Sequence, residues 1–204
     1  MLLIGLTGSI GMGKSTAAAR FRAVGIPVVD ADAEVHKLYE GAAVAPIETA
    51  FPGTTTGGKV DRQKLAEALL NRPDRFKRLE AIVHPLVFAA ERALLRTEAA
   101  KGAAMAVLEI PLLLETGGEK RVDVVVVVSA PADAQRARVM QRPGMTAEKL
   151  DQLLARQMPD AEKRRRADFI VDTGGTFAET DAQVDNIVES LKGRAGTAFD
   201  DHWR

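Results

Sequence analysis

The sequence contains no cysteine and very little histidine. With no cysteine in 204 residues, disulfide bonds and thiolate metal sites are excluded. The three histidines, at positions 36, 84 and 202, have no spacing that would build a zinc site. These absences point away from disulfide-stabilised and zinc-dependent proteins.

An excess of either charge is also absent. The 28 basic and 28 acidic residues give a formal net charge of zero, whereas proteins that bind polyanions without regard to sequence usually carry a basic excess. The short run Lys163–Arg166 lacks interleaved aromatic residues and is flanked by Glu162 and Asp168. We therefore expect it to be a solvated basic face, and we expect no nucleic-acid partner.

Long hydrophobic runs are missing as well. The longest candidate, residues 103–114, is interrupted by Glu109 and Pro111 and falls short of the about 18 residues of a spanning helix. The first residues have no basic segment of the kind that opens a signal peptide. The sequence therefore predicts a cytoplasmic protein without a membrane partner. Its 46% hydrophobic and 27% charged residues are typical of one globular domain, or of one domain with a small insert.

Short, nearly continuous apolar runs predict buried strands of a parallel sheet, because such strands are covered on both faces. The five runs are Leu2–Thr7, Ile26–Val29, Ala106–Ile110, Val122–Ser129 and Phe169–Asp172. Helical patterns occupy Lys14–Val24, Thr146–Met158 and Ala178–Leu191. Strands alternating with helices predict a three-layer α/β/α fold with a five-stranded parallel sheet.

The connection between the second and third runs is far longer than an ordinary crossover. Its predicted helices are Ala33–Glu40, Arg62–Leu70, Asp74–Val83 and Leu86–Ala100, separated by turn signals that include His84-Pro85. We expect residues 33–100 to form a helical insert domain, and residues 1–32 and 101–192 to form the core. A second interruption, about residues 136–160, is expected to form a lid. Residues 193–204 are expected to form a polar tail, and the sequence leaves open whether it docks.

The segment Gly8–Ser15, with the sequence GSIGMGKS, matches the phosphate-binding pattern G-x-x-x-x-G-K-[ST] between a strand and a helix. Its glycines allow the backbone to turn successive N–H groups toward a phosphate chain, and the helix adds its positive end. We expect Lys14 to reach the β- and γ-phosphates of ATP, and Ser15 to give its hydroxyl to Mg²⁺. The predicted nucleotide contacts are Gly8, Gly11, Met12, Gly13, Lys14, Ser15 and Thr16, together with Arg138 of the expected lid.

Two other nucleotide-binding classes fit poorly. The dinucleotide pattern G-x-G-x-x-G fails, because counting from Gly11 places Thr16 at its last glycine. A GTPase needs N-K-x-D, and the nearest string, Glu148–Asp151, lacks the asparagine. A D-x-x-G string at Asp172–Gly175 follows the last strand, which is too late for a γ-phosphate switch.

A kinase needs a base close to the phosphate loop, and Asp32 is our candidate. It follows the second strand in Val29-Asp-Ala-Asp32, and the carboxyl ends of parallel strands face the ligand crevice. The structural alternative is that Asp32 caps the next helix. Asp30 is expected to be a cap or a support for Asp32.

A carboxylate and a group of arginines complete the candidate site. Glu109 ends the third strand, where phosphate-loop proteins place the carboxylate that organises Mg²⁺; the alternative is a solvated acid. The arginines of the lid are expected to neutralise the transferred phosphoryl group. Arg138 and Arg142, spaced by four, would share a helix face; the alternative for each is a solvated basic face. Two further positions could be either site residues or structural ones. His84 could simply end a helix, and Arg62 could simply form a surface pair with Asp61.

Together these motifs resemble the dephospho-CoA kinase family in colinear order over residues 2–175. The matching segments are Leu6–Thr16, Val29–Asp32, Gly58–Arg62 with Leu65-Ala66, Leu79–Pro85, Ile110–Glu115, the Gln135, Arg138 and Arg142 set, Ala155–Met158 and Ala167–Asp172. Two positions depart from the family pattern. Leu114 stands where an aromatic residue is common, and Thr173 stands where asparagine is frequent. We expect the change at Thr173 to have little consequence.

The resemblance implies ATP-dependent phosphorylation of the ribose 3′-hydroxyl of dephospho-CoA, the last step of coenzyme A synthesis. It implies that Asp32 is the base, that Arg142 and Arg138 are lid cations, and that the insert around Arg62 and His84 binds the acceptor. The residues by themselves lead to a phosphate-loop kinase with an insert and a lid. They leave open a kinase for another small hydroxyl or a nucleoside monophosphate, and a nucleotide-switched binding module. The oligomeric state is not readable from the sequence.

Overall fold

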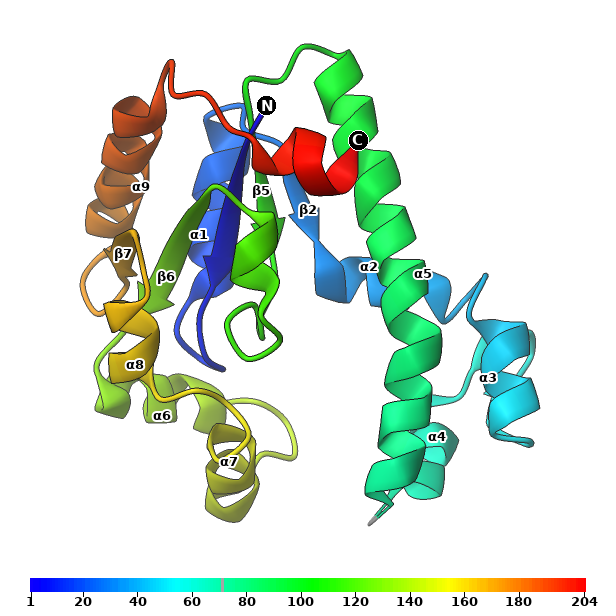
Figure 1. The fold of residues 1–204 in the computed structure, drawn as a ribbon. Coiled ribbons are helices and arrows are strands. Elements are labelled where there is room, and N and C mark those ends of the chain that lie inside the picture. The colour runs from blue at the N-terminus through cyan, green and yellow to red at the C-terminus, as the bar shows by residue number, and fades with distance from the viewer. Residues whose placement is uncertain (71) are drawn as a thin grey trace. The chain divides into compact units, whose positions relative to one another are not determined.

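The structure, a computed structural model, describes residues 1–70 and 72–204, which fall into two units (Figure 1). The first unit comprises Met1–Val29 and Leu95–Arg204, and the second comprises Asp30–Leu94.

The first unit is built on a five-stranded sheet with the order β2-β5-β1-β6-β7. The strands are β1 (Leu2–Thr7), β2 (Val28–Asp30), β5 (Met105–Glu109), β6 (Val124–Ser129) and β7 (Phe169–Asp172). β1 runs parallel to both β5 and β6, and β6 runs parallel to β7. The predicted three-layer fold with a five-stranded parallel sheet is confirmed.

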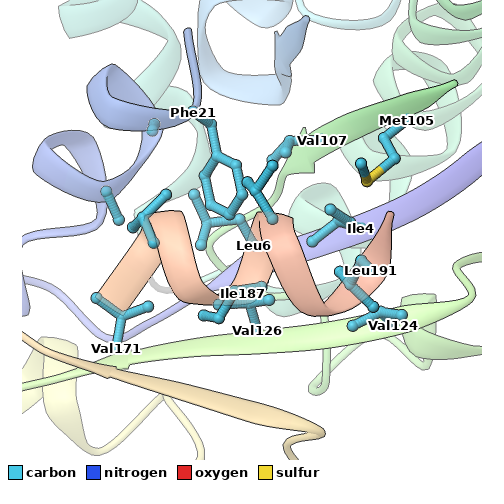
Figure 2. Close-up of a cluster of buried hydrophobic side chains, with 14 of the residues drawn as sticks. Ile4, Leu6, Phe21, Met105, Val107, Val124, Val126, Val171, Ile187 and Leu191 are labelled. Carbon is cyan, nitrogen blue, oxygen red and sulfur yellow. The ribbon is translucent and has the colours of Figure 1, made fainter. Parts of the chain in front are cut away.

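Two helices, α1 (Lys14–Ala23) and α9 (Phe177–Leu191), cover one face of this sheet (Figure 1). Alternate strand residues point to opposite faces, so Ile4 and Leu6 of β1 join Phe21 of α1 and Ile187 of α9 in one buried cluster (Figure 2). The opposite face packs against the segment that follows β5, which includes Leu113 and Leu114, and against α8 (Asp160–Arg165). The strands are therefore covered on both faces, which is why they read as continuous apolar runs.

The C-terminal tail docks on the first unit. It ends in a short helix, η2 (Phe199–Trp203), whose Trp203 is 1% exposed and donates from Nε1 to the carbonyl of Arg121 at 2.8 Å. Asp123 accepts from the backbone N–H groups of Thr197 and Ala198. The buried indole and these hydrogen bonds explain why a polar tail is ordered.

The second unit is mainly helical. Its elements are α2 (Ala31–Leu38), α3 (Val44–Ala50), β3 (Thr55–Thr56), β4 (Lys59–Val60), α4 (Arg62–Leu69) and the first part of α5 (Pro73–Ala100). They surround a small apolar cluster that contains Ile47, Phe51, Leu65 and Val83. The sequence patterns missed α3 and the β3–β4 hairpin, because both elements are too short to show a period.

The predicted break at His84-Pro85 was wrong, because α5 continues through Pro85. A proline inside a helix removes one backbone hydrogen bond and crowds the preceding turn. Here Leu79 and Val83 before it, and Val87 after it, all pack into the same apolar cluster, which keeps both halves of the helix in place. No helix within the described residues is long and apolar enough to cross a bilayer.

The prediction that the run Lys163–Arg166 is solvated was wrong for its first member. Lys163 is fully buried, with its ammonium 2.8 Å from Oε1 of Glu115 and 3.3 Å from the carbonyl of Pro111. The same Oε1 accepts from the backbone N–H of Met158. A run of basic residues in the sequence does not reveal that one lysine points inward to a carboxylate 48 residues earlier in the chain.

Lys163→Met is expected to lower the free energy of unfolding by about 3–5 kcal/mol, because it leaves the Glu115 carboxylate without its charge partner. Lys163→Met combined with Glu115→Gln should recover most of this loss, since the amide is neutral and still accepts from Met158. Urea denaturation followed by circular dichroism measures both variants. A single variant as stable as the wild type would contradict the role of the pair.

Candidate active site

The segment between β1 and α1 forms a tight loop that depends on its glycines. Gly11 and Gly13 adopt φ angles of 78° and 85°, which other residues rarely accept. A Cβ on Gly8 would lie 2.6 Å from the carbonyl oxygen of Val128, and one on Gly11 would lie 2.4 Å from a methyl of Val139. Both the backbone angles and the close neighbours therefore require glycine.

The loop presents several unused backbone donors. The N–H of Met12 donates to the carbonyl of Ser9 at 3.1 Å. By contrast, the N–H groups of Gly11, Gly13, Lys14 and Ser15 have no acceptor within the described residues. Helix α1 begins here without a side-chain cap and without an acidic residue in its first turn. Unpaired donors at a helix N-terminus form an anion site, which suits a phosphate chain.

Lys14 and Glu109, both predicted site residues, lie together. The Lys14 ammonium is 2.6 Å from Oε1 of Glu109, and the guanidinium of Arg22 is 3.6 Å from Oε2. Glu109 is only 4% exposed. The carboxylate therefore holds the phosphate-loop lysine at the carboxyl end of the sheet, beside the row of free N–H groups.

The protein atoms here also fit Mg²⁺. The exposed Ser15 hydroxyl and the Glu109 carboxylate are hard oxygen ligands, which Mg²⁺ prefers. No group of three or more His, Asp or Glu within residues 1–70 and 72–204 is arranged to hold a metal by itself. Mg²⁺ at phosphate sites keeps several waters and takes phosphate oxygens, so two protein oxygens are a suitable donor set.

The lid segment contains α6 (Ala132–Met140) and α7 (Ala147–Leu154). The expectation that Arg138 and Arg142 share a helix face was wrong, because α6 ends at Met140 and Arg142 lies in the following bend. The Arg142-Pro-Gly sequence stops the helix, since proline cannot continue it and Gly144 has a φ of 71°. Arg142 is exposed.

Arg138 contacts the phosphate loop instead of solvent. Its guanidinium donates to the carbonyl and the hydroxyl of Thr173 at 2.6 and 3.0 Å, and to the carbonyl of Gly11 at 3.4 Å. Thr173 is 5% exposed and donates to the carbonyl of Met12 at 2.7 Å. Both backbone groups of Ile10 are also bound, its carbonyl by Gln135 at 2.8 Å and its N–H by Gln157 at 3.1 Å.

The sequence predicted Arg138 as a lid cation and a nucleotide contact, and it gave no role to the other loop-binding side chains. Gln135, Gln157 and Thr173 lie between 125 and 161 residues from their partners in the chain. The only sequence signal for the glutamines is their place in segments that resemble the family.

In the second unit the structure separates the roles of the two aspartates. Asp30 is the N-cap of α2 and accepts from the N–H of Ala33 at 3.1 Å. Asp32 lies in the first turn, is exposed, and makes no hydrogen bond or ion pair within the described residues. The capping alternative for Asp32 is therefore excluded, and α2 begins two residues earlier than predicted.

Arg62 lies in a cluster with His36 of α2 and with Tyr39, the residue that follows α2. Its guanidinium lies 2.7 Å from Nδ1 of His36 and 5.6 Å from the centre of the Tyr39 ring. Burial raises the pKa of Tyr39, and the nearby Arg62 charge opposes that shift. The sequence analysis missed His36 here. His84 is exposed within α5 and does not end a helix, as one alternative had it.

The chain is similar to known proteins over nearly its whole length. The dephospho-CoA kinase family model matches residues 2–179. A dephospho-CoA kinase of Brucella melitensis is 55% identical over 198 residues, which cover 97% of this chain and 99% of the relative. A solved structure from Thermus thermophilus, TT1252, has a TM-score of 0.81 at 38% identity and covers 94% of this chain and 98% of its own.

A dephospho-CoA kinase from Campylobacter jejuni has a TM-score of 0.70 at 26% identity, with coverage of 93% of this chain and 96% of its own. Its fold is therefore similar over nearly the whole length of both chains. Family model, curated relative and solved structures agree, and the chain belongs to the dephospho-CoA kinase family.

Proposed function

We propose that this protein transfers the γ-phosphoryl group of ATP to the ribose 3′-hydroxyl of dephospho-CoA, giving coenzyme A and ADP. The observation that carries the proposal is the phosphate loop, whose free N–H groups and Lys14 suit a phosphate chain, in a member of the dephospho-CoA kinase family. The identity of the acceptor rests on the family alone.

The proposed reaction assigns a role to each candidate site residue. The free N–H groups of Gly11, Gly13, Lys14 and Ser15 hold the β- and γ-phosphates, and Gly8, Met12 and Thr16 complete the nucleotide contacts. Lys14 neutralises the charge that develops on the oxygens of the transferred group. Asp32 accepts the proton of the acceptor hydroxyl as its oxygen attacks phosphorus. Arg62 and His84 bind the acceptor, and residues 33–100 form its binding domain.

Mg²⁺, held by Ser15 and Glu109, would neutralise phosphate charge when bound. The exposure of Ser15 and the buried, negatively charged Glu109 support this assignment. The zero net charge supports a small-molecule substrate instead of a polyanion, with the few phosphate-binding cations concentrated at the loop and the lid. We also propose that the kinase acts in the cytoplasm.

Arg142 is proposed as a lid cation that acts on the transition state. Arg142→Ala is expected to lower kcat by about 10- to 1000-fold with little change in the affinity for ATP, because the cation stabilises charge that appears only during transfer. Steady-state kinetics and nucleotide titration separate the two effects. Loss of ATP affinity at an unchanged kcat would contradict this role.

The proposed function is tested by coupling ADP release to a spectroscopic readout for several acceptors. Dephospho-CoA should give the highest kcat/KM, and ³¹P NMR of the product should show a new 3′-phosphomonoester. Faster turnover with a nucleoside monophosphate or another small alcohol would replace this function with that of a different kinase. Slow hydrolysis without any acceptor would indicate a nucleotide-switched module.

A further inference from the structure

Three consecutive carbonyl groups of the phosphate loop are each bound by a side chain from outside the loop. Gln135 Nε2 donates to Ile10 at 2.8 Å, Arg138 donates to Gly11 at 3.4 Å, and the Thr173 hydroxyl donates to Met12 at 2.7 Å. These three partners come from α6 and from the segment after β7, so two separate parts of the first unit converge on one turn.

The direction of these bonds decides where the loop's N–H groups point. In a planar trans peptide the carbonyl and the following N–H point in opposite directions. A carbonyl of Ile10 fixed outward therefore turns the N–H of Gly11 inward, and a carbonyl of Met12 fixed outward does the same for Gly13. These two N–H groups are among the four that have no acceptor in the described part of the chain.

The glycines make such external support necessary. Gly11 and Gly13 flank the affected peptides, and glycine restricts its own backbone angles less than any other residue. Each of the two peptides, Ile10–Gly11 and Met12–Gly13, adjoins a glycine, and such a peptide plane rotates easily unless something holds it. Thr173 is itself well held, because it is 5% exposed, accepts from Arg138 at 3.0 Å and bonds to the carbonyl of Ser129 through its backbone N–H at 2.9 Å.

We infer that Gln135 and Thr173 are positioning residues that orient the peptide groups of the phosphate loop, so that the N–H groups of Gly11 and Gly13 face the nucleotide phosphates before the nucleotide binds. Neither side chain touches the nucleotide in this role. Gln157 completes the support by accepting from the N–H of Ile10. The inference rests on the proposed function only in taking a nucleotide phosphate as the ligand of the loop.

Thr173→Val removes the hydroxyl and keeps the shape of the side chain. We expect it to weaken ADP binding about tenfold, because a misoriented N–H loses a charge-assisted hydrogen bond to phosphate. Thr173→Ser keeps the hydroxyl and should bind ADP as the wild type does. Gln135→Leu should weaken ADP binding by a similar factor, which provides a second variant if Thr173→Val does not fold.

The matched control is Thr180→Val, which removes another buried hydroxyl bound to a backbone carbonyl, at 2% exposure in α9. Isothermal titration calorimetry with ADP and thermal melting are measured for all four variants. The inference requires weaker ADP binding in Thr173→Val and Gln135→Leu, rescue by serine, and unchanged binding in Thr180→Val.

Wild-type affinity in Thr173→Val, or a loss in Thr180→Val of the same size, would overturn the inference. ADP binding is measured without an acceptor, so the outcome does not depend on which acceptor the enzyme phosphorylates. If ADP binding behaves as expected but dephospho-CoA is not phosphorylated, the proposed function fails and the inference stands.

Discussion

Lys14→Ala is expected to slow phosphoryl transfer by about 10²–10³-fold. The lysine lies at the phosphate loop with its ammonium 2.6 Å from Glu109, and it is the loop's own cation. Removing a preorganised charge that faces the transferred group typically costs a factor of this size. Single-turnover kinetics at saturating ATP and acceptor measure the effect directly.

The fold of this variant must be checked separately, because Glu109 is buried and loses its closest cation. Arg22 remains 3.6 Å from the other carboxylate oxygen and limits the penalty. Lys101→Ala is the matched control, since Lys101 forms a surface pair with Glu98 at 2.7 Å and should leave the rate unchanged. An unimpaired rate in Lys14→Ala with a native melting curve would remove Lys14 from the mechanism.

Asp32→Asn is expected to reduce kcat by about 10²–10⁴-fold, because the amide cannot accept the proton of the acceptor hydroxyl. The structure sharpens this prediction, since Asp32 is exposed in the first turn of α2 and does not cap it. The substitution should therefore leave α2 intact. Rapid-quench measurement of product formation gives the rate of the chemical step.

Asp30→Asn is the natural comparison, two residues away. Asp30 caps α2, and asparagine caps a helix about as well as aspartate, so this variant should keep a nearly normal rate and stability. A loss of activity in Asp30→Asn as large as that in Asp32→Asn would argue against a specific base at position 32.

Much of the fold was readable because it follows from local patterns. Strands β1 and β7 coincide with the apolar runs that predicted them, and β5 and β6 lie within two residues of theirs. The phosphate loop could be predicted equally well, because its glycines, lysine and serine are close together in the sequence and each has a chemical role in binding phosphate or Mg²⁺. Local sequence is sufficient where the structural cause is itself local.

Two of the errors have a common physical origin in contacts between distant residues. Pro85 reads as a helix break, yet the apolar cluster on both sides of it holds α5 together. Lys163 reads as a surface charge, yet Glu115 binds it in the interior. In each case tertiary packing outweighs the local preference, and a single sequence carries no record of that packing.

The candidate site also contains features with local causes and features that depend on long-range contacts. The sequence by itself determined the phosphate loop, the order of strands along the chain, and the candidates Lys14, Asp32 and Glu109. Only the tertiary structure decided that Glu109 binds Lys14. It alone showed Thr173 bound to Met12, 161 residues away. The orientation of a glycine-rich loop depends on the side chains that fold back against it, and those positions are set by the sheet and the helices together.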